Sequence, residues 1–170
     1  LERCTNLAEA IKAYEAVIAL EPGNPRAIEF LKSGYEKRRE WDKLLPLLRH
    51  EAAAAPHHVQ LDAYLNIARF VSEKVKRPEA STEMWEEVLN RDPGNMDAPA
   101  QLSGLYERAK DFPKLAHVLR EQAAQTADAT ARVNLLVKLG MIASDKLSDD
   151  ALAVEAWRGV LVLDPNDRRA

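Results

Sequence analysis

An internal repeat constrains the fold of this chain more than any other feature. The turn sequence Pro-Gly-Asn at 22–24 recurs at 93–95, and Asp-Pro-Asn at 164–166 repeats part of it. Pro22, Pro93 and Pro165 therefore mark two almost equal steps along the chain. A regular period is typical of repeat proteins, in which each unit packs only against its neighbours. The 170-residue chain is predicted to be an array of packed units rather than one central core.

Apolar residues inside each repeat follow the spacing of one helical face. Ile11, Tyr14, Val17 and Ile18 show this spacing, and no comparable stretch alternates strictly as a half-buried strand would. Because a proline, glycine or polar interruption recurs roughly every 15 to 20 residues, the helices are expected to form pairs. The predicted helices are 6–20, 25–38, 41–55, 59–76, 79–90, 96–109, 112–125, 129–146 and 149–162.

Residues at the predicted helix ends explain where the helices begin and stop. Asn24 and Asn95 are expected to cap helices with their side-chain oxygens. Pro46 lies past the first turn of its predicted helix, so it should kink that helix, or else the helix begins later than drawn. The repeat leaves a few extra residues in every second hairpin, which predicts longer loops near Lys76 and Ser148.

Composition and charge exclude several classes of protein. The chain is 46% hydrophobic and 30% charged, and its 6 glycines and 9 prolines fit neither a disordered chain nor a loop-rich β domain. Lys and Arg number 24 against 27 Asp and Glu, for a net charge of -3, so there is no cationic surplus for general nucleic-acid binding. Cys4 is the only cysteine, which excludes an intrachain disulfide and a multi-cysteine metal site.

Membrane insertion is also unexpected, because the longest apolar stretches are far shorter than the roughly 18 to 20 residues that span a bilayer. The chain does not begin with methionine, so we expect it to be cut from a longer protein, and a targeting signal could lie outside it. The compartment is undetermined, with a soluble cytoplasmic protein favoured.

Candidate catalytic and metal-binding residues are few. His50, His57 and His58 are the most suggestive cluster, but they are interpreted as a helix end and an exposed loop, since no cysteine or matched carboxylate pair accompanies them. The pairs Asp149-Asp150 and Glu86-Glu87 are interpreted as solvated helix charges. No phosphate-binding loop, zinc-protease motif or nucleophile elbow occurs. The sequence therefore predicts no enzyme activity, no cofactor and no metal.

Residues spaced along the predicted helices resemble the tetratricopeptide repeat. Ala10, Tyr14, Val17 and Pro22 match the family's second-helix pattern of alanine, aromatic residue, small residue and terminating proline. Two further copies have the same spacing: Ser81, Trp85, Val88 and Pro93, then Ala153, Trp157, Val160 and Pro165. Leu139-Gly140 and Ile67-Ala68 look like the family's first-helix Leu-Gly pair. The alternate repeats depart from the pattern, so the resemblance is to a divergent array.

The resemblance implies an all-α fold, a right-handed α-solenoid of antiparallel helix hairpins. Residues 1–170 would form a single repeat domain, with a half-repeat at 1–22 and hairpins at about 25–56, 59–92, 96–126 and 129–164. Such a fragment of a longer solenoid is expected to self-associate through its terminal faces. Trp157, Val160 and Leu161 are expected to lack their next neighbour there.

The resemblance also implies a non-catalytic scaffold that binds a peptide or protein domain on a concave face built from first helices. The residues expected on that face are Arg26, Phe30, Ser33, Lys37, Leu65, Asn66, Arg69, Gln101, Gly104, Arg108, Asn134, Lys138 and Met141. A structural spacer within a large assembly is the alternative, and a helical-repeat RNA-binding module is a further one. The RNA alternative is disfavoured by the acidic balance of charge.

Overall fold

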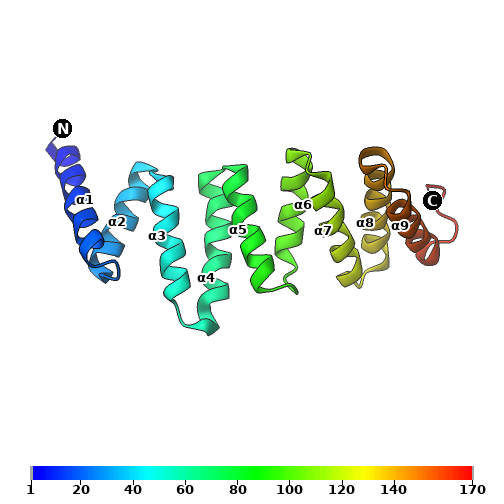
Figure 1. The fold of residues 1–170 in the computed structure, drawn as a ribbon, viewed down its shortest axis with the longest axis horizontal. Coiled ribbons are helices and arrows are strands. Elements are labelled where there is room, and N and C mark those ends of the chain that lie inside the picture. The colour runs from blue at the N-terminus through cyan, green and yellow to red at the C-terminus, as the bar shows by residue number, and fades with distance from the viewer. Residues whose placement is uncertain (1, 170) are drawn as a thin grey trace. The chain divides into compact units, whose positions relative to one another are not determined.

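The computed structural model describes the backbone of residues 2–169 and the side chains of residues 6–169, so the side chain of Cys4 lies outside the described residues. Within this part the regular structure is entirely helical (Figure 1). The helices are α1 (Glu2–Leu20), α2 (Pro25–Arg38), α3 (Trp41–Ala54), α4 (His57–Phe70), α5 (Pro78–Arg91), α6 (Asp97–Ala109), α7 (Phe112–Gln125), α8 (Ala129–Ile142) and α9 (Asp150–Leu163), with π-helical segments η1 (Val71–Val75) and η2 (Ala143–Leu147). The all-α prediction is confirmed, and each predicted helix is present.

The chain divides into two compact units, an N-terminal unit of residues Leu1–Phe70 and a C-terminal unit of residues Val71–Ala170. In the N-terminal unit, α1 packs on α2, α2 on α3, and α3 on α4. In the C-terminal unit, α5 to α9 pack in the same sequential way. Short connections make successive helices of each unit antiparallel, so each unit is built from adjacent hairpins (Figure 1).

The predicted asparagine caps are in place. The Asn24 side chain accepts a hydrogen bond from the Ala27 N–H at 3.1 Å. The Asn95 side chain accepts two, from the N–H groups of Asp97 at 3.0 Å and Ala98 at 2.9 Å. Each therefore satisfies backbone donors that have no partner inside the helix.

The prediction of longer loops near Lys76 and Ser148 is wrong. The extra residues of the repeat form no long loops; they continue α4 and α8 as the π-helical segments η1 and η2, which take up additional residues inside the helical run. Lys76 and Ser148 follow with φ of 56° and 54°, and this left-handed conformation ends the helical run. Helix α3 begins at Trp41 and contains Pro46, so the later start considered for it does not occur.

The core of the N-terminal unit is centred on Ile11, Leu31, Tyr35 and Leu44. Aromatic side chains extend it at both ends. Tyr14 stacks on Phe30 with ring centroids 4.3 Å apart. Trp41 meets Phe70 edge to face at 5.7 Å. Half-buried hydrophobic residues that pack against this core are Leu7, Tyr14, Ile18, Phe30, Trp41, Leu47, Leu48 and Phe70.

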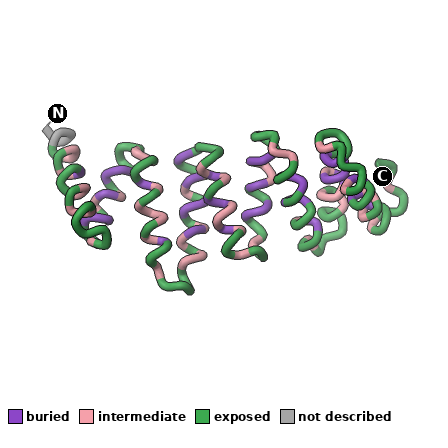
Figure 2. Tube along the Cα trace, in the orientation of Figure 1, coloured by how far each residue is buried: buried purple, intermediate pink, exposed green. Residues whose placement is uncertain are grey.

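Buried positions recur along the helices of the C-terminal unit (Figure 2), and leucine and valine are frequent among them. Trp157 lies so close to Gly140 that a Cβ atom there would approach the indole ring to 2.5 Å. The Leu-Gly pair of α8 thus lets two helices approach around the tryptophan. The fully buried residues of this unit include Val71, Val88, Leu102, Leu115, Leu119, Leu139 and Val160.

The exposed end of α9 differs from the prediction. Val160 is fully buried, and Trp157 is half-buried because its indole ring packs against Gly140 of α8. The large hydrophobic residues exposed on this helix are Val154, Leu161 and Val162. Of the three residues expected to lack a neighbour, only Leu161 is exposed.

Candidate functional site

The residues predicted to bind a partner lie on α2, α4, α6 and α8. Phe30, Leu65, Gly104 and Lys138 are half-buried, and the other predicted residues are exposed. Phe30 packs on Tyr14 as part of the N-terminal core. The exposed residues among those predicted therefore form part of the accessible surface of these four helices.

A groove of about 250 Å³ opens among α2, α3 and α4 of the N-terminal unit. We call it the Glu36 groove; it is lined by Lys32, Glu36, Leu44, Leu48, Asn66, Ile67 and Phe70. Apolar side chains make up most of the lining, and Asn66 is the residue that the sequence had predicted for a binding surface. Such an apolar groove with a few polar groups is typical of sites that hold a side chain or a small ligand.

At the corresponding place in the C-terminal unit, an ion pair joins two helices. One repeat further along the chain, Glu107 occupies the position of Glu36, and Lys138 occupies that of Asn66. The Lys138 ammonium contacts the Glu107 carboxylate at 2.8 Å, joining α8 to α6. The predicted residue Lys138 is thus engaged within its own unit.

A second groove, of about 310 Å³, lies among η1, α5 and α6. It brings together the predicted residues Gln101 and Arg108 with Lys76, which no sequence pattern had suggested. Its full lining is Ser72, Lys76, Pro78, Ser81, Gln101, Leu105 and Arg108. Two cationic side chains and no carboxylate line this groove, so it is polar and positively charged. The Arg108 Nε donates to the Gly104 carbonyl at 2.9 Å, which orients the guanidinium along α6.

Side chains of the described residues form a Glu-Tyr-Lys triad in each unit, and these triads were missed from the sequence. In the N-terminal unit the Glu15 carboxylate accepts hydrogen bonds from the Tyr35 hydroxyl at 2.9 Å and the Lys43 ammonium at 2.7 Å. The Lys43 ammonium also lies 5.5 Å from the centre of the Tyr35 ring. The three side chains therefore tie α1, α2 and α3 together.

The triad of the C-terminal unit repeats this arrangement. The Glu86 carboxylate accepts from the Tyr106 hydroxyl at 2.7 Å and from the Lys114 ammonium at 2.8 Å. Glu86, Tyr106 and Lys114 each follow their N-terminal counterparts by the same repeat step. The repeated spacing of the tyrosines and lysines was visible in the sequence, and the same spacing of the glutamates was the signal that would have completed the triad.

The triads shift the pKa values of their glutamates and tyrosines, but in directions that do not favour catalysis. Hydrogen bonds from Lys43 and then Tyr35 lower the pKa of Glu15. For Glu86, burial raises the pKa, but hydrogen bonds from Lys114 and Tyr106 outweigh it, so the pKa is lowered. Burial, together with the glutamate partner, raises the pKa of each tyrosine. Each glutamate is held ionised and each tyrosine neutral, which favours a structural clasp over proton transfer near neutral pH.

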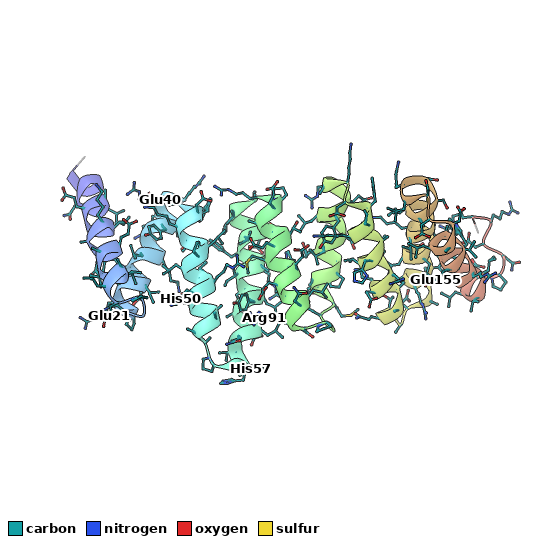
Figure 3. All side chains as sticks on the ribbon, viewed as in Figure 1. Glu21, Glu40, His50, His57, Arg91 and Glu155 are labelled. Carbon is teal, nitrogen blue, oxygen red and sulfur yellow. The ribbon has the colours of Figure 1, made fainter. Side chains whose placement is uncertain are left out.

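The histidines and paired carboxylates do not form a reactive cluster. His57 is the first residue of α4, and His50 lies on α3 (Figure 3). Among the described residues, no group of three or more His, Cys, Asp and Glu side chains is placed to hold a metal ion. Asp149 caps α9 through the Leu152 N–H, and Glu87 pairs with Arg91. These polar groups have structural roles.

In the described part of the chain, no helix has both the length and the apolar character that crossing a bilayer requires. No protein-family model and no curated protein matches the sequence.

Comparison with solved structures finds matches of low sequence identity over most of this chain. YrrB, described as a TPR protein with an unusual peptide-binding site, shares 11% identity at a TM-score of 0.46, covering 99% of this chain and 84% of its own. MamA shares 15% identity at a TM-score of 0.48, with 96% and 92% covered. The C-terminal part of a TPR repeat-containing protein from Cytophaga hutchinsonii shares 16% at 0.47, with 96% and 62% covered. The fold assignment rests on the helix hairpins of this chain itself.

Proposed function

We propose that this chain is a non-catalytic scaffold that binds a peptide or a domain of a partner protein. The proposed surface consists of α2 and α4 in the N-terminal unit and of α6 and α8 in the C-terminal unit. The observation that carries the proposal is that α2 and α4 line one groove, with Asn66 accessible at its rim, and α6 lines another, with Gln101 and Arg108 accessible. A preformed groove on rigid helices loses little conformational entropy when a partner binds.

The chemistry of the described residues supports a binding role over catalysis. The polar constellations found are capping groups, surface ion pairs and the two Glu-Tyr-Lys triads. In each triad the carboxylate is already engaged by two donors, which leaves it poorly suited to act as a general base. Recognition of another macromolecule needs only shape, accessible polar groups and apolar area, and the grooves provide these.

Position-specific photo-crosslinking tests the proposal. A photoreactive residue is placed at Asn66 or Gln101, in the grooves, and at Ala53 or Ala124, which are exposed on α3 and α7. Ala53 and Ala124 are matched controls, because they occupy equivalent positions of the repeat in the two units. In extracts of the cells that produce the protein, we expect crosslinks to a partner from the groove positions and none from the controls.

Two results would argue against this function. Equal crosslinking from all four positions would indicate that the whole surface is packed in an assembly, as a structural spacer requires. A salt-sensitive shift on titration with single-stranded RNA would favour the RNA-binding alternative, because such binding releases counterions.

A further inference from the structure

The Glu36 groove and the equivalent place in the C-terminal unit are built from equivalent helices of the repeat but carry different polar side chains. In the C-terminal unit, the side chain of Lys138 extends from α8 to the carboxylate of Glu107 on α6. In the N-terminal unit the matching carboxylate, Glu36, shares its groove with Asn66 in place of a lysine, and the space between the helices is open. The Lys138–Glu107 pair thus shows, within the same chain, that a lysine side chain can reach the carboxylate at this position of the repeat.

The floor of the Glu36 groove is apolar. Leu44, Leu48, Ile67 and Phe70 supply it from α3 and α4. Phe70 is held in place by its edge-to-face contact with Trp41. The groove measures about 250 Å³, whereas an apolar cavity of about 150 Å³ already accommodates benzene. It therefore has room for one large apolar side chain or for the aliphatic stem of a lysine or arginine.

The rim of the groove carries one uncompensated negative charge. Lys32 is neutralised by an ion pair with Glu51 at 2.7 Å. In the C-terminal unit the same two positions are Ser103 and Gln122, which form a neutral hydrogen bond at 3.0 Å. Glu36 is exposed, and its carboxylate makes no hydrogen bond or ion pair with any residue in the described part of the chain. The lining therefore presents apolar area beside a carboxylate that is free to accept a cation.

We infer that the Glu36 groove binds a basic side chain of a partner protein, a lysine or arginine adjacent to an apolar residue. The aliphatic stem and the apolar neighbour cover the floor, and the cationic head pairs with Glu36 as Lys138 pairs with Glu107. This inference rests on the proposed function, since it names the chemistry of the partner segment that one part of the proposed surface recognises.

A capped heptapeptide with the central sequence Leu-Lys-Leu, flanked by serine and glycine, is the probe for this groove. It is titrated into the full chain while the backbone amide resonances are followed by NMR. We expect saturable shifts at Asn66, Ile67 and Phe70. A peptide with glutamate in place of lysine should bind about tenfold more weakly or not at all, because it places a like charge beside Glu36.

Variants of the protein distinguish the contribution of the Glu36 carboxylate to peptide affinity from that of the rest of the groove. Glu36→Gln should weaken binding roughly threefold, and Glu36→Lys by about tenfold or more. Glu29→Gln is the matched control, an exposed glutamate on the same helix outside the groove lining, and should leave the affinity unchanged. Lys138→Ala frees Glu107, so the same peptide should then shift resonances of Val137 and Leu139 in the C-terminal unit.

Three outcomes would overturn the inference. These are no shift in α4 at millimolar peptide, equal binding of the lysine and glutamate peptides, and equal affinity of Glu36→Lys and the unaltered chain. If any of these occurs while the crosslinks from Asn66 and Gln101 persist, the scaffold function stands and the proposed chemistry of the partner falls. If the crosslinks are absent but charge-dependent peptide binding is present, the groove chemistry stands without the scaffold function.

Discussion

The two units share their internal clasp and differ in the rim of their grooves. Glu15, Tyr35 and Lys43 make the same three-membered contact in the N-terminal unit as Glu86, Tyr106 and Lys114 do in the C-terminal unit. At the rim of the Glu36 groove, by contrast, a carboxylate that is unpaired among the described residues corresponds to the Glu107 carboxylate that is paired with Lys138 in the C-terminal unit. The clasp joins three helices and depends on particular side chains, whereas exposed rim residues can change without disturbing the packing.

The largest expected effect comes from matched cavities in the two cores. Leu31 and Leu102 occupy equivalent positions of the repeat and are 2% and 0% exposed. Replacing either by alanine should cost about 2–5 kcal/mol. Hydrogen exchange measured by mass spectrometry reports each unit separately. We expect Leu31→Ala to lower protection in residues 6–70 and Leu102→Ala to lower it in 71–169, because repeat units are stabilised by nearest neighbours.

The same hydrogen-exchange measurement shows whether the two units unfold independently of each other. If either substitution lowers protection equally throughout the chain, the two units unfold as one cooperative body. The exposed substitution Ser33→Ala on α2 is the control and should change protection nowhere, since Ser33 contributes nothing to the core.

A second pair of substitutions compares two helical glycines. At Gly140 a Cβ atom would lie 2.5 Å from the rigid indole ring of Trp157, whereas at Gly34 it would lie 3.0 Å from the terminal Cδ1 of Ile11. Gly140→Ala should therefore destabilise the protein by about 1–3 kcal/mol. Gly34→Ala should stay within about 1 kcal/mol of the unaltered chain, since the gain in helix propensity offsets a small shift of Ile11. Urea denaturation checks both, and a more destabilising Gly34→Ala would contradict the assigned packing.

Much of the fold follows from the sequence because its signals are local. Apolar spacing placed the helices, and the proline, glycine and asparagine residues placed the turns between them, as Asn24 and Asn95 show. The π-helical segments could not be foreseen this way. The spacing revealed surplus residues, but whether they enter a loop or widen a helix depends on tertiary packing, such as the buried Val71 and Val75 of η1.

The candidate site was predictable only in part. The repeat pattern pointed to the helices that line the grooves, and it included Asn66, Gln101 and Arg108. It did not reveal Glu36 or Lys76. A groove forms where three segments pack together, and the spacing of residues within one helix does not determine that packing. Lys138 was predicted to face a partner, yet it pairs with Glu107 in its own unit. Charge pairs between helices depend on the register of their packing.

A third prediction compares the two helix caps. Asn95 accepts hydrogen bonds from two backbone N–H groups, whereas Asn24 accepts from one. Asn95→Ala should cost about 1–2 kcal/mol and Asn24→Ala about 0.5–1 kcal/mol. Thermal unfolding followed by circular dichroism measures both. The corresponding aspartate variants are controls that should retain most of the stability, and a larger loss for Asn24→Ala would reverse the expected order of the caps.

The smallest effect concerns the two clasps and their dependence on pH. Both glutamates have a pKa below the ordinary 4.5, so folding favours their ionised form. Their contribution is complete above about pH 4.5 and is lost as pH falls through the lower pKa of the folded state. Each partner lysine is more than half exposed, so solvent screening keeps the cost of Glu15→Gln or Glu86→Gln below about 1 kcal/mol at pH 7.

Urea denaturation between pH 3 and pH 7 checks this expectation. Each glutamine variant should lose less stability on acidification than the unaltered chain, because one pH-dependent contribution has been removed. Glu29→Gln, at an exposed glutamate outside either clasp, should follow the unaltered chain. Equal acid sensitivity of the clasp variants and the unaltered chain would show that the triads act through packing alone. A difference between Glu15→Gln and Glu86→Gln would show that burial, which opposes ionisation more strongly at Glu86, makes the two clasps energetically unequal despite their matching geometry.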